Sequence, residues 1–217
     1  MNSTTSEKPE ISLMKKILIR VRYGLTLQTI RSVLMKIGIE FTPFYIFQEG
    51  VYTMDNPEIH GTITDFSIEL LESSDMKILG DVYVGFSEKG FLALLEAGEK
   101  CIGLKHKDEL AAFMWINFKE LRYKATVINL KSNEAYLWFM HTMESYRGKN
   151  LAPYLRYKSY EMLKEMDCDV LYSISDCFNS PAVRFKEKLN AKKREIILFI
   201  KLFNLISWCF TLKSYKC

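Results

Sequence analysis

Hydrophobic and polar positions repeat with two different spacings along this chain, and the repeats are clearest in its second half. Apolar residues at helical spacing predict a helix over 151–166, with Pro153 in its first turn, and a second helix over 179–190. Short apolar runs are typical of strands, which we predict over 62–71, 100–106, 110–118, 134–143, 169–175 and 193–203. This order of elements indicates an α/β or α+β fold, in which helices flank a mixed central sheet.

The first sixty residues follow these patterns less well. Residues 26–38 have the spacing of an amphipathic helix. Residues 40–50 place Pro43 before an apolar run, which favours a strand at the edge of a sheet. We therefore expect residues 1–60 to form a tail with a small N-terminal helical and extended appendage, and residues 61–217 to form the main domain.

The composition is that of a globular protein with a substantial core, since 48% of the 217 residues are hydrophobic. The five cysteines are widely spread and contain no Cys-x-x-Cys pair, so we predict neither a disulfide framework nor a zinc site, and a reducing cytoplasm fits best. His60 and His106 make no ligand pattern, and we expect no metal. The most apolar run, 196–212, contains Lys201 and is short for a membrane-spanning helix, so a strand is the first interpretation.

A net charge of +4 conceals two basic ends. Residues 13–37 contain six Lys and Arg and no acid, and residues 191–217 contain six Lys and Arg and one Glu. Basic residues mixed with Leu, Ile and Val would suit the inner face of a membrane or an anionic substrate such as a sugar nucleotide, and an ordinary solvated surface is the alternative. No motif for reading bases is present, so nucleic acid is not an expected partner.

The junction before the first predicted helix, "ESYRGKNLAPYL" at 144–155, has the residue types of an anion-binding turn. Gly148 would let the backbone turn tightly, and the first amides of the following helix have no acceptor within that helix. Arg147 and Lys149 add positive charge, and Asn150 is among the few residues other than glycine that tolerate left-handed geometry. The pattern indicates a phosphate cradle, with a plain turn as the alternative.

The same stretch resembles the acetyl-CoA pyrophosphate loop of the GNAT superfamily of N-acetyltransferases, whose pattern is Gln or Arg, two residues, Gly, one residue, then Gly or Ala. A second stretch, "NSPAVRFKEKLNAKK" at 179–193, resembles a later helix of the same superfamily, which an Asn opens and in which an Ala follows three residues on. The resemblance covers about 64–203. It implies a GNAT-like fold and acetyl transfer from acetyl-CoA to a small-molecule amine acceptor, for which an amino sugar of surface polysaccharide is one candidate.

Carried over by position, the resemblance also implies a set of residues that hold the cofactor. They are Thr142, Arg147, Gly148, Lys149, Asn150, Leu151, Ala152 and Asn179. In the family, a backbone amide near the position of Thr142 contacts the acetyl carbonyl, and the residue at the position of Asn179 approaches the pantetheine arm. Ser145 and Asn150 depart from the usual loop residues, and Lys186 stands where many members have a tyrosine that protonates the departing thiolate.

A base must also remove a proton from the incoming amine. His141 is the first candidate, because it lies on the strand before the loop and an imidazole titrates near neutrality; a core histidine is the alternative. Glu134 at the start of that strand comes next, and Glu144 and Asp176 are further alternatives. Aromatic residues at 136–139 are expected in the core, with a substrate groove as the other interpretation. The resemblance predicts an enzyme, and a GNAT-shaped binding module without catalysis is the competing class.

Overall fold

The computed structural model describes residues 26–50, 55–61, 65–83 and 85–215. The predicted N-terminal tail lies outside these residues. The described helices are α2 (Thr26–Lys36), α3 (Met76–Val82), α4 (Glu88–Glu96), α5 (Leu151–Glu165) and α6 (Ser180–Lys188), with short 3-10 turns η1 (Ser73–Asp75) and η2 (Glu144–Tyr146). The described strands are β1 (Ile39–Glu49), β2 (Phe66–Leu71), β3 (Lys100–His106), β4 (Glu109–Asn117), β5 (Glu120–Tyr123), β6 (Thr126–Asn129), β7 (Glu134–Thr142), β8 (Val170–Asp176), β9 (Lys192–Leu202) and β10 (Ile206–Ser214).

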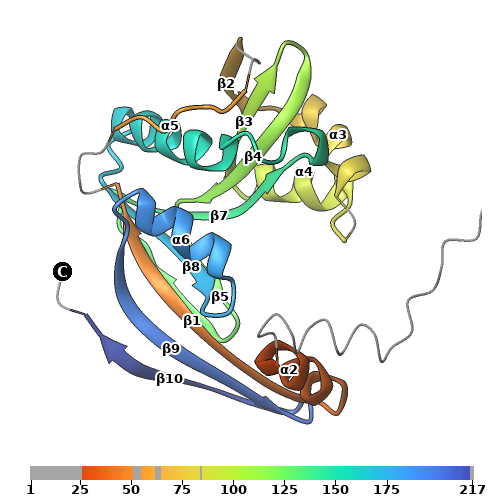
Figure 1. Ribbon diagram of the computed structural model, residues 1–217, viewed down its shortest axis with the longest axis vertical. Helices are drawn as coiled ribbons and strands as arrows, with labels where there is room; N and C mark the ends of the chain where they lie inside the picture. The colour runs from red at the N-terminus through yellow and green to blue at the C-terminus, as the bar shows by residue number, and fades with distance from the viewer. Residues whose placement is uncertain (1–25, 51–54, 62–64, 84, 216–217) are drawn as a thin grey trace, which may run out of the picture.

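One large mixed sheet contains eight of these strands in the order β10, β9, β1, β8, β7, β4, β3, β2, and β5 and β6 form a separate hairpin. Among the described strands only β7 and β8 pair in parallel. In Figure 1 the long strands β1, β9 and β10 run diagonally away from the part of the sheet formed by β2, β3 and β4. The predicted fold class is confirmed, and the two predicted helices of the second half are α5 and α6.

The N-terminal strand β1 lies in the middle of the large sheet. It pairs with β8 on one side and with β9 on the other, so residues that we expected in a separate appendage belong to the central sheet. The edge position predicted for 40–50 is therefore wrong. Pro43 is tolerated because its carbonyl faces the side of β8, where it accepts the Cys177 N–H at 2.9 Å, just past the last residue of β8, Asp176. The nitrogen of Pro43, which carries no hydrogen, faces the same side. The β1–β8 ladder ends at Phe44, so no N–H group is needed at residue 43.

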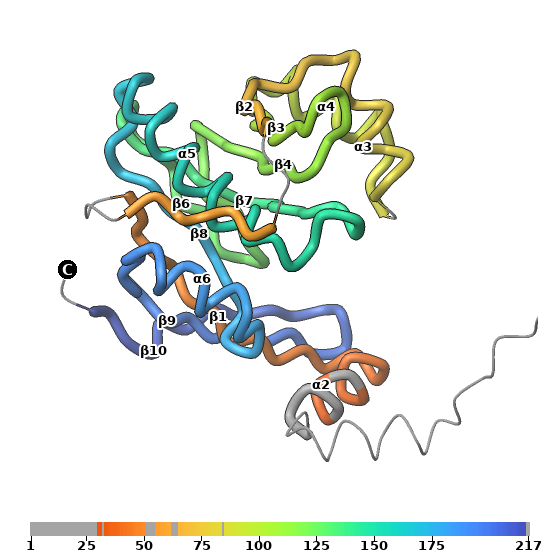
Figure 2. The backbone as a smooth tube through the Cα atoms, turned by 45° about the horizontal axis from the view of Figure 1, so that its top comes forward, coloured from red at the N-terminus to blue at the C-terminus, as the bar shows by residue number. Residues whose placement is uncertain are grey.

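Side chains of β8 alternate between two differently covered faces of the sheet. Ser173 points to the side where Glu49 contacts Tyr160 of α5 and Lys186 of α6. The neighbouring Tyr172 points the other way and packs in a cluster with the β5–β6 hairpin. We call these two sides the helix face and the hairpin face. In Figures 1 and 2, α5 lies along the β7 part of the sheet and α6 along the β8 part.

Two local structures were not anticipated from the sequence. The turn of the β5–β6 hairpin contains no Gly or Asn, and Lys124 adopts a positive φ of 55° there. The apolar run 196–212 extends over two strands, β9 and β10, joined by a turn in which Phe203 and Asn204 have φ of 52° and 59°. Within the described ranges, no helix combines the length and apolar character needed to span a membrane.

Candidate active site

The parallel strands β7 and β8 diverge toward their carboxyl ends. Their ladder ends at Tyr136 and Tyr172, although β7 continues to Thr142. On its other side β7 has a bulge, because Phe139 and Met140 face a single residue of β4, and Phe139 has a φ of 44°. Because the β7–β8 ladder ends at Tyr136, the backbone edge of β7 that faces β8 has no ladder partner beyond that residue. The sheet opens there.

A cavity of about 640 Å³ passes through this opening, and we call it the gap cavity. From the helix face it is lined by Arg156 of α5 and Lys186 of α6, and from the hairpin face by Tyr123 and Asp176. Its volume is within the range of small-molecule sites. Because both faces contribute to one cavity, a ligand that enters from one face can meet a ligand that enters from the other.

The aromatic segment at 136–139 contributes both to the core and to the lining of a cavity. Tyr136 is buried with the hairpin cluster, whereas Trp138 and Phe139 are partly buried against the main core. All three side chains also line the gap cavity. The strand that closes part of the core is thus also a wall of the site.

The loop between β7 and α5 forms a smaller cavity of about 330 Å³, the loop cavity. Gly148 has a φ of 79°, and a Cβ atom there would meet no atom within 4 Å, so a ligand has room beside the backbone. Asn150 precedes α5 in the left-handed conformation, with a φ of 62°. The amides of Leu151 and Ala152 belong to the first turn of α5, where the helix offers no acceptor and its dipole is positive. These features fit a diphosphate group.

A segment from the connection between β1 and β2, residues 55–61, lies against this loop. The His60 N–H donates to the Lys149 carbonyl at 2.9 Å, and Asn150 Nδ2 donates to the Glu58 carbonyl at 2.7 Å. His60 also lines the loop cavity. Asn150 and Glu58 are 92 positions apart, so no local pattern could have indicated this support.

The basic side chains of the loop have partners of their own. Arg147 NH1 lies 3.1 Å from Glu144 Oε1, and both side chains are exposed. The Lys149 ammonium lies 4.7 Å from the centre of the Tyr146 ring. An exposed ion pair of this type contributes at most about 1 kcal/mol, so Arg147 can turn toward a phosphate at small cost.

The structure brings together most of the residues predicted to hold the cofactor. Those that line the loop cavity are Thr142, Arg147, Gly148, Asn150, Leu151 and Ala152. Lys149 belongs to the same loop and points to Tyr146. Asn179 lies apart from them on the gap cavity, where its side chain accepts the Ala182 N–H at 3.3 Å and caps α6.

The predicted bases His141 and Glu134 are not brought together. His141 lines a third cavity, of about 690 Å³, and its ring packs edge-on against Tyr83 with centres 5.5 Å apart. Burial and the nearby charge of Arg147 lower the pKa of His141. Glu134 lies at the closed end of the gap, where it accepts a hydrogen bond from the Tyr172 hydroxyl at 3.2 Å.

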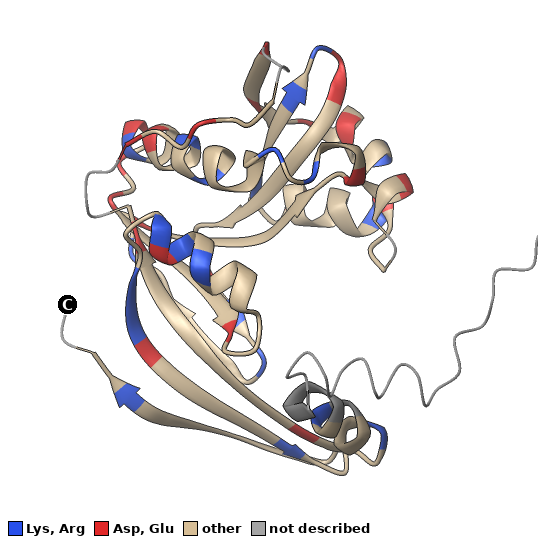
Figure 3. Cartoon of the chain, in the orientation of Figure 1, with Lys and Arg blue, Asp and Glu red and all other residues tan. Residues whose placement is uncertain are grey.

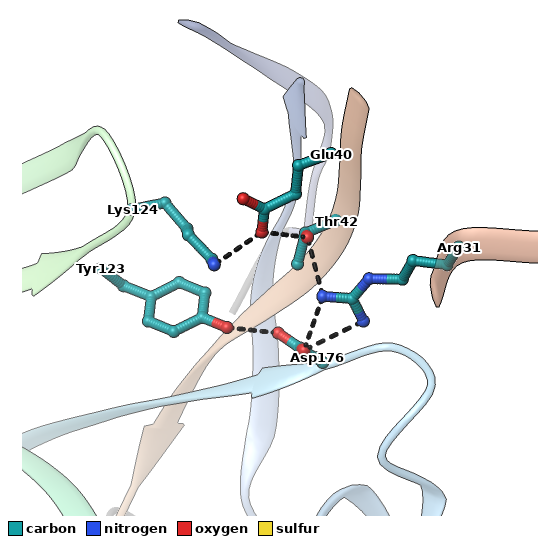
Figure 4. A network of polar contacts seen from close by, with 6 residues as sticks. All are labelled: Arg31, Glu40, Thr42, Tyr123, Lys124 and Asp176. Carbon is teal, nitrogen blue, oxygen red and sulfur yellow. Dashed lines mark hydrogen bonds and ion pairs between the residues drawn. The ribbon is translucent and has the colours of Figure 1, made fainter. Parts of the chain in front are cut away.

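Asp176 ends β8 on the hairpin face and is held by residues from two other elements (Figure 4). The Tyr123 hydroxyl of β5 donates to Asp176 Oδ1 at 2.5 Å, and Arg31 of α2 lies 3.4 Å from Oδ2. Burial and the neighbouring carboxylate raise the pKa of Tyr123, so its hydroxyl stays protonated and remains a donor. The Asp176 side chain is still 24% exposed, which leaves the carboxylate open to the cavity.

A second set of bonds holds Arg31 in place. Arg31 NH2 donates to the Thr42 hydroxyl at 2.9 Å, that hydroxyl donates to Glu40 at 3.1 Å, and Lys124 donates to Glu40 at 2.6 Å. The sequence indicates Asp176 as an alternative base, but no local pattern indicates its partners. They come from the N-terminal elements and from the hairpin, and only the folded sheet places them beside β8.

A buried charge cluster lies at the helix-face side of the gap cavity, and the sequence patterns missed it as well. The fully buried carboxylate of Glu49 lies 3.6 Å from Arg156 Nε and 4.0 Å from Lys186 Nζ. It accepts hydrogen bonds from the hydroxyls of Tyr160, at 2.5 Å, and Ser173. Burial by itself would raise the pKa of Glu49, but the two cations and the two hydroxyls hold it below its ordinary value.

The chain is an α/β protein whose mixed sheet opens between two parallel strands, beside a helix N-terminus of the kind that can bind anions. The model of the Acetyltransferase (GNAT) family matches residues 69–191, which is more than half of the chain. The chain belongs to the GNAT acetyltransferase family. No curated protein matches the sequence.

Solved structures share the fold at low sequence identity. A GNAT-family acetyltransferase from Colwellia psychrerythraea is 13% identical in sequence, with a TM-score of 0.56. The match covers 90% of this chain and 75% of that protein. A Drosophila protein is 16% identical with a TM-score of 0.55, and the match covers 82% of this chain but only 57% of that protein. The yncA protein of Salmonella typhimurium, whose structure contains acetyl-CoA, is 10% identical in sequence, with a TM-score of 0.50. The match covers 71% of this chain and 98% of that protein.

Proposed function

We propose that this protein transfers an acetyl group from acetyl-CoA to an amine acceptor. The observation that carries the proposal is the gap cavity, which is lined from both faces of the sheet. A donor held at the loop on the helix face and an amine held by Asp176 on the hairpin face would meet inside it. Holding two reactants in one place supplies much of the rate by itself. Family membership and the acetyl-CoA in the yncA structure support acetyl-CoA as the donor.

The residues around the loop fit the phosphates of acetyl-CoA. Gly148 leaves room beside the backbone, the amides of Leu151 and Ala152 can donate to phosphate oxygens, and Arg147 adds charge. When bound, acetyl-CoA supplies a thioester that an amine can attack. The backbone edge of β7 beyond Tyr136 has amides without ladder partners, and such amides can stabilise the negative charge that develops on an acyl oxygen.

Asp176 is the group we propose to receive the amine. Its carboxylate faces the gap cavity, can pair with an ammonium and can then accept a proton from it. Tyr123 and Arg31 fix its two oxygens, which keeps the carboxylate in one orientation. His141 and Glu134 stay predictions from the sequence, and we place Asp176 ahead of them because Asp176 lines this cavity.

The acceptor class that we propose is an amino sugar, free or as a sugar nucleotide. The side chains of Tyr123 and Trp138 line the gap cavity, and the apolar side of a sugar can pack on aromatic rings. Arg122 and Lys124 line the same cavity; each pairs with a carboxylate, Glu120 or Glu40, and has further N–H groups that can donate to phosphates of a nucleotide. This combination of rings and cations supports a sugar acceptor with anionic groups.

Thiol release from acetyl-CoA in the presence of a panel of amines tests this function. We expect release with amino sugars or their nucleotide forms, and a loss of about 10²-fold in kcat/KM for the amine in Asp176→Asn, because the amide cannot accept a proton. The affinity for acetyl-CoA should not change. Asp169→Asn is the matched control, since Asp169 is an exposed aspartate immediately before the first residue of the same strand.

One result would remove the role of Asp176, and another would argue against an enzyme of this type. Equal losses in Asp176→Asn and Asp169→Asn would remove the special role of Asp176. If acetyl-CoA binds but no amine in the panel releases thiol, the non-catalytic binding module becomes the better interpretation.

Contact with the inner face of a membrane remains a prediction from the basic ends. Residues 13–25 lie outside the described residues, but basic residues of the other end lie on β9 and β10 (Figure 3). An exposed apolar row on β10 accompanies them: Ile206, Trp208, Phe210 and Leu212. We expect the protein to pellet with anionic vesicles at low salt and less at high salt, because screening weakens the attraction. Absence of pelleting at low salt would contradict this prediction.

A further inference from the structure

Arg156 is a buried cation whose hydrogen-bond donors are not all used. It lies on α5 and lines the gap cavity, yet its side chain is only 3% exposed. Its Nε and NH1 atoms are buried without a hydrogen-bond partner among the described residues. A guanidinium is not deprotonated in proteins, and burial of a charged group without hydrogen-bond partners is costly. Arg156 therefore lacks an acceptor, which a ligand in the cavity can supply.

The carboxylate of Glu49 does not fill this role. Its Oε2 atom accepts a hydrogen bond from the Tyr160 hydroxyl at 2.5 Å and lies 3.6 Å from Arg156 Nε, which is beyond hydrogen-bond distance. Its Oε1 atom accepts from the Ser173 hydroxyl and lies 4.0 Å from Lys186 Nζ. Both oxygens thus bind hydroxyl donors, and Glu49 compensates the charge of Arg156 without a hydrogen bond.

Positive charge exceeds negative charge in this buried cluster. Glu49 is one carboxylate shared by two cations, Arg156 and Lys186. Burial lowers the pKa of Lys186 to about 7; Glu49 opposes this shift and Arg156 adds to it. The Lys186 ammonium does have an acceptor, the Ile174 carbonyl of β8, at 2.8 Å. A second carboxylate, placed at Arg156, would therefore balance the two cations and provide the missing acceptor.

The side from which Arg156 approaches the cavity indicates which substrate carries that carboxylate. α5 begins at the loop that we propose for the phosphates of the donor, and Arg156 lies in the second turn of the same helix. Asp176 lies on the hairpin face, where we place the amine. An acetyl group has only a methyl group beyond its carbonyl, which offers Arg156 no acceptor. A longer acyl group that ends in a carboxylate would offer one.

We propose that Arg156 binds a carboxylate at the end of the acyl group, so that the protein accepts dicarboxylic acyl groups such as malonyl or succinyl from coenzyme A. This inference rests on the proposed acyl transfer and extends its range of donors. The bond changes stay at the thioester: the amine lone pair forms the C–N bond, and the C–S bond breaks with its electron pair on sulfur. The acceptor ammonium loses two protons, one of which ends on the thiol and the other in solvent.

Arg156→Met leaves a cluster whose charges still balance. Glu49 keeps Lys186 as its counter-charge, and the hydroxyls of Tyr160 and Ser173 still donate to it. Because Arg156 lowers the pKa of Lys186, its removal favours the charged form of this lysine. We therefore expect the variant to fold. Arg156→Lys is the second variant, since it keeps a positive charge and loses the planar fork that matches a carboxylate.

The test compares the affinities of coenzyme A thioesters that differ only in a terminal carboxylate or methyl group, measured by calorimetry. Succinyl-CoA and butyryl-CoA form one pair, and malonyl-CoA and propionyl-CoA form the other. We expect the wild type to bind the carboxylate member of at least one pair about 10-fold more tightly. This preference should disappear in Arg156→Met and shrink in Arg156→Lys. Arg184→Met is the matched control and should keep it, because Arg184 is an exposed arginine on α6.

Proton uptake gives a second readout of the same contact. A carboxylate beside Arg156 adds negative charge near Lys186 and raises the pKa of that lysine from about 7. At pH 7 the wild type should therefore take up as much as about half a proton more with the preferred carboxylate thioester than with its methyl counterpart. Binding enthalpies in buffers of different ionisation enthalpy measure this uptake, and Arg156→Met should lack the difference.

The outcomes separate this inference from the function on which it rests. Equal affinities within both pairs would overturn the carboxylate site and leave acetyl transfer unaffected. A full preference for the carboxylate thioesters in both Arg156→Met and Arg156→Lys would overturn the role of Arg156. If no thioester binds to the wild type, acetyl-CoA included, the proposed acetyl transfer itself fails.

Discussion

Gly148→Glu is expected to abolish the stabilisation of the protein by acetyl-CoA. At an acetyl-CoA concentration about a hundred times its Kd, the wild type should gain about 2.7 kcal/mol, which corresponds to a rise of about 5–10 °C in Tm for a chain of this length. The variant places a carboxylate in the space that Gly148 leaves open for phosphate, and it forces a side chain onto a residue with a φ of 79°. Thermal unfolding with and without acetyl-CoA measures both effects.

Two further variants isolate the reason for this loss. Gly85→Glu is the matched control, because Gly85 also has a positive φ, 117°, and open space around its Cβ position, but lies between α3 and α4. It should keep the full response to acetyl-CoA. Gly148→Ala should lose about 1–2 kcal/mol of stability through backbone strain while it retains part of the response. A full response in Gly148→Glu would show that the diphosphate does not bind at this loop.

Glu49→Gln is expected to destabilise the protein by about 3 kcal/mol or more, measured by urea unfolding at pH 7. The amide keeps the volume of the side chain, but Tyr160 and Ser173 donate to different oxygens of Glu49, so its single oxygen can replace only one of these two acceptors. It leaves Arg156 and Lys186 buried without a counter-charge, and unpaired buried charge is costly. Lys186 can release its proton near neutrality, but the guanidinium of Arg156 cannot.

The effect of Glu49→Gln should also depend on pH. The folded pKa of Glu49 lies below its unfolded value, near 4.3, so its stabilisation is complete above that value and is lost as the pH falls through the folded pKa. The difference in unfolding free energy between wild type and variant should therefore shrink in acid. Glu161→Gln is the control, because Glu161 makes only a surface pair with Lys158 and should cost about 0.5 kcal/mol or less. Similar costs for both variants would contradict the buried cluster.

The parts of the site that could be predicted from the sequence are those whose signals are local. A proline in the first turn indicated where α5 begins, and Gly148 and Asn150 indicated a turn with left-handed residues directly before it. Each of these signals rests on the conformational preference of one residue, which acts within a few positions. The β5–β6 hairpin was missed because Lys124 takes a turn conformation that its residue type rarely adopts, held there by packing against the sheet.

The sequence by itself determined the helices α2, α5 and α6, most of the strands and the turn before α5, since periodicity and turn residues act over short distances. Only the tertiary structure decided that β1 lies inside the sheet, that Arg31 and Tyr123 hold Asp176, and that Glu49 faces Lys186. Strand partners and buried charges are chosen by which surfaces pack together over the whole chain. The residues next to Glu49 in the sequence do not indicate which cation will pair with it. The fold brings Arg156 and Lys186 to it from other elements.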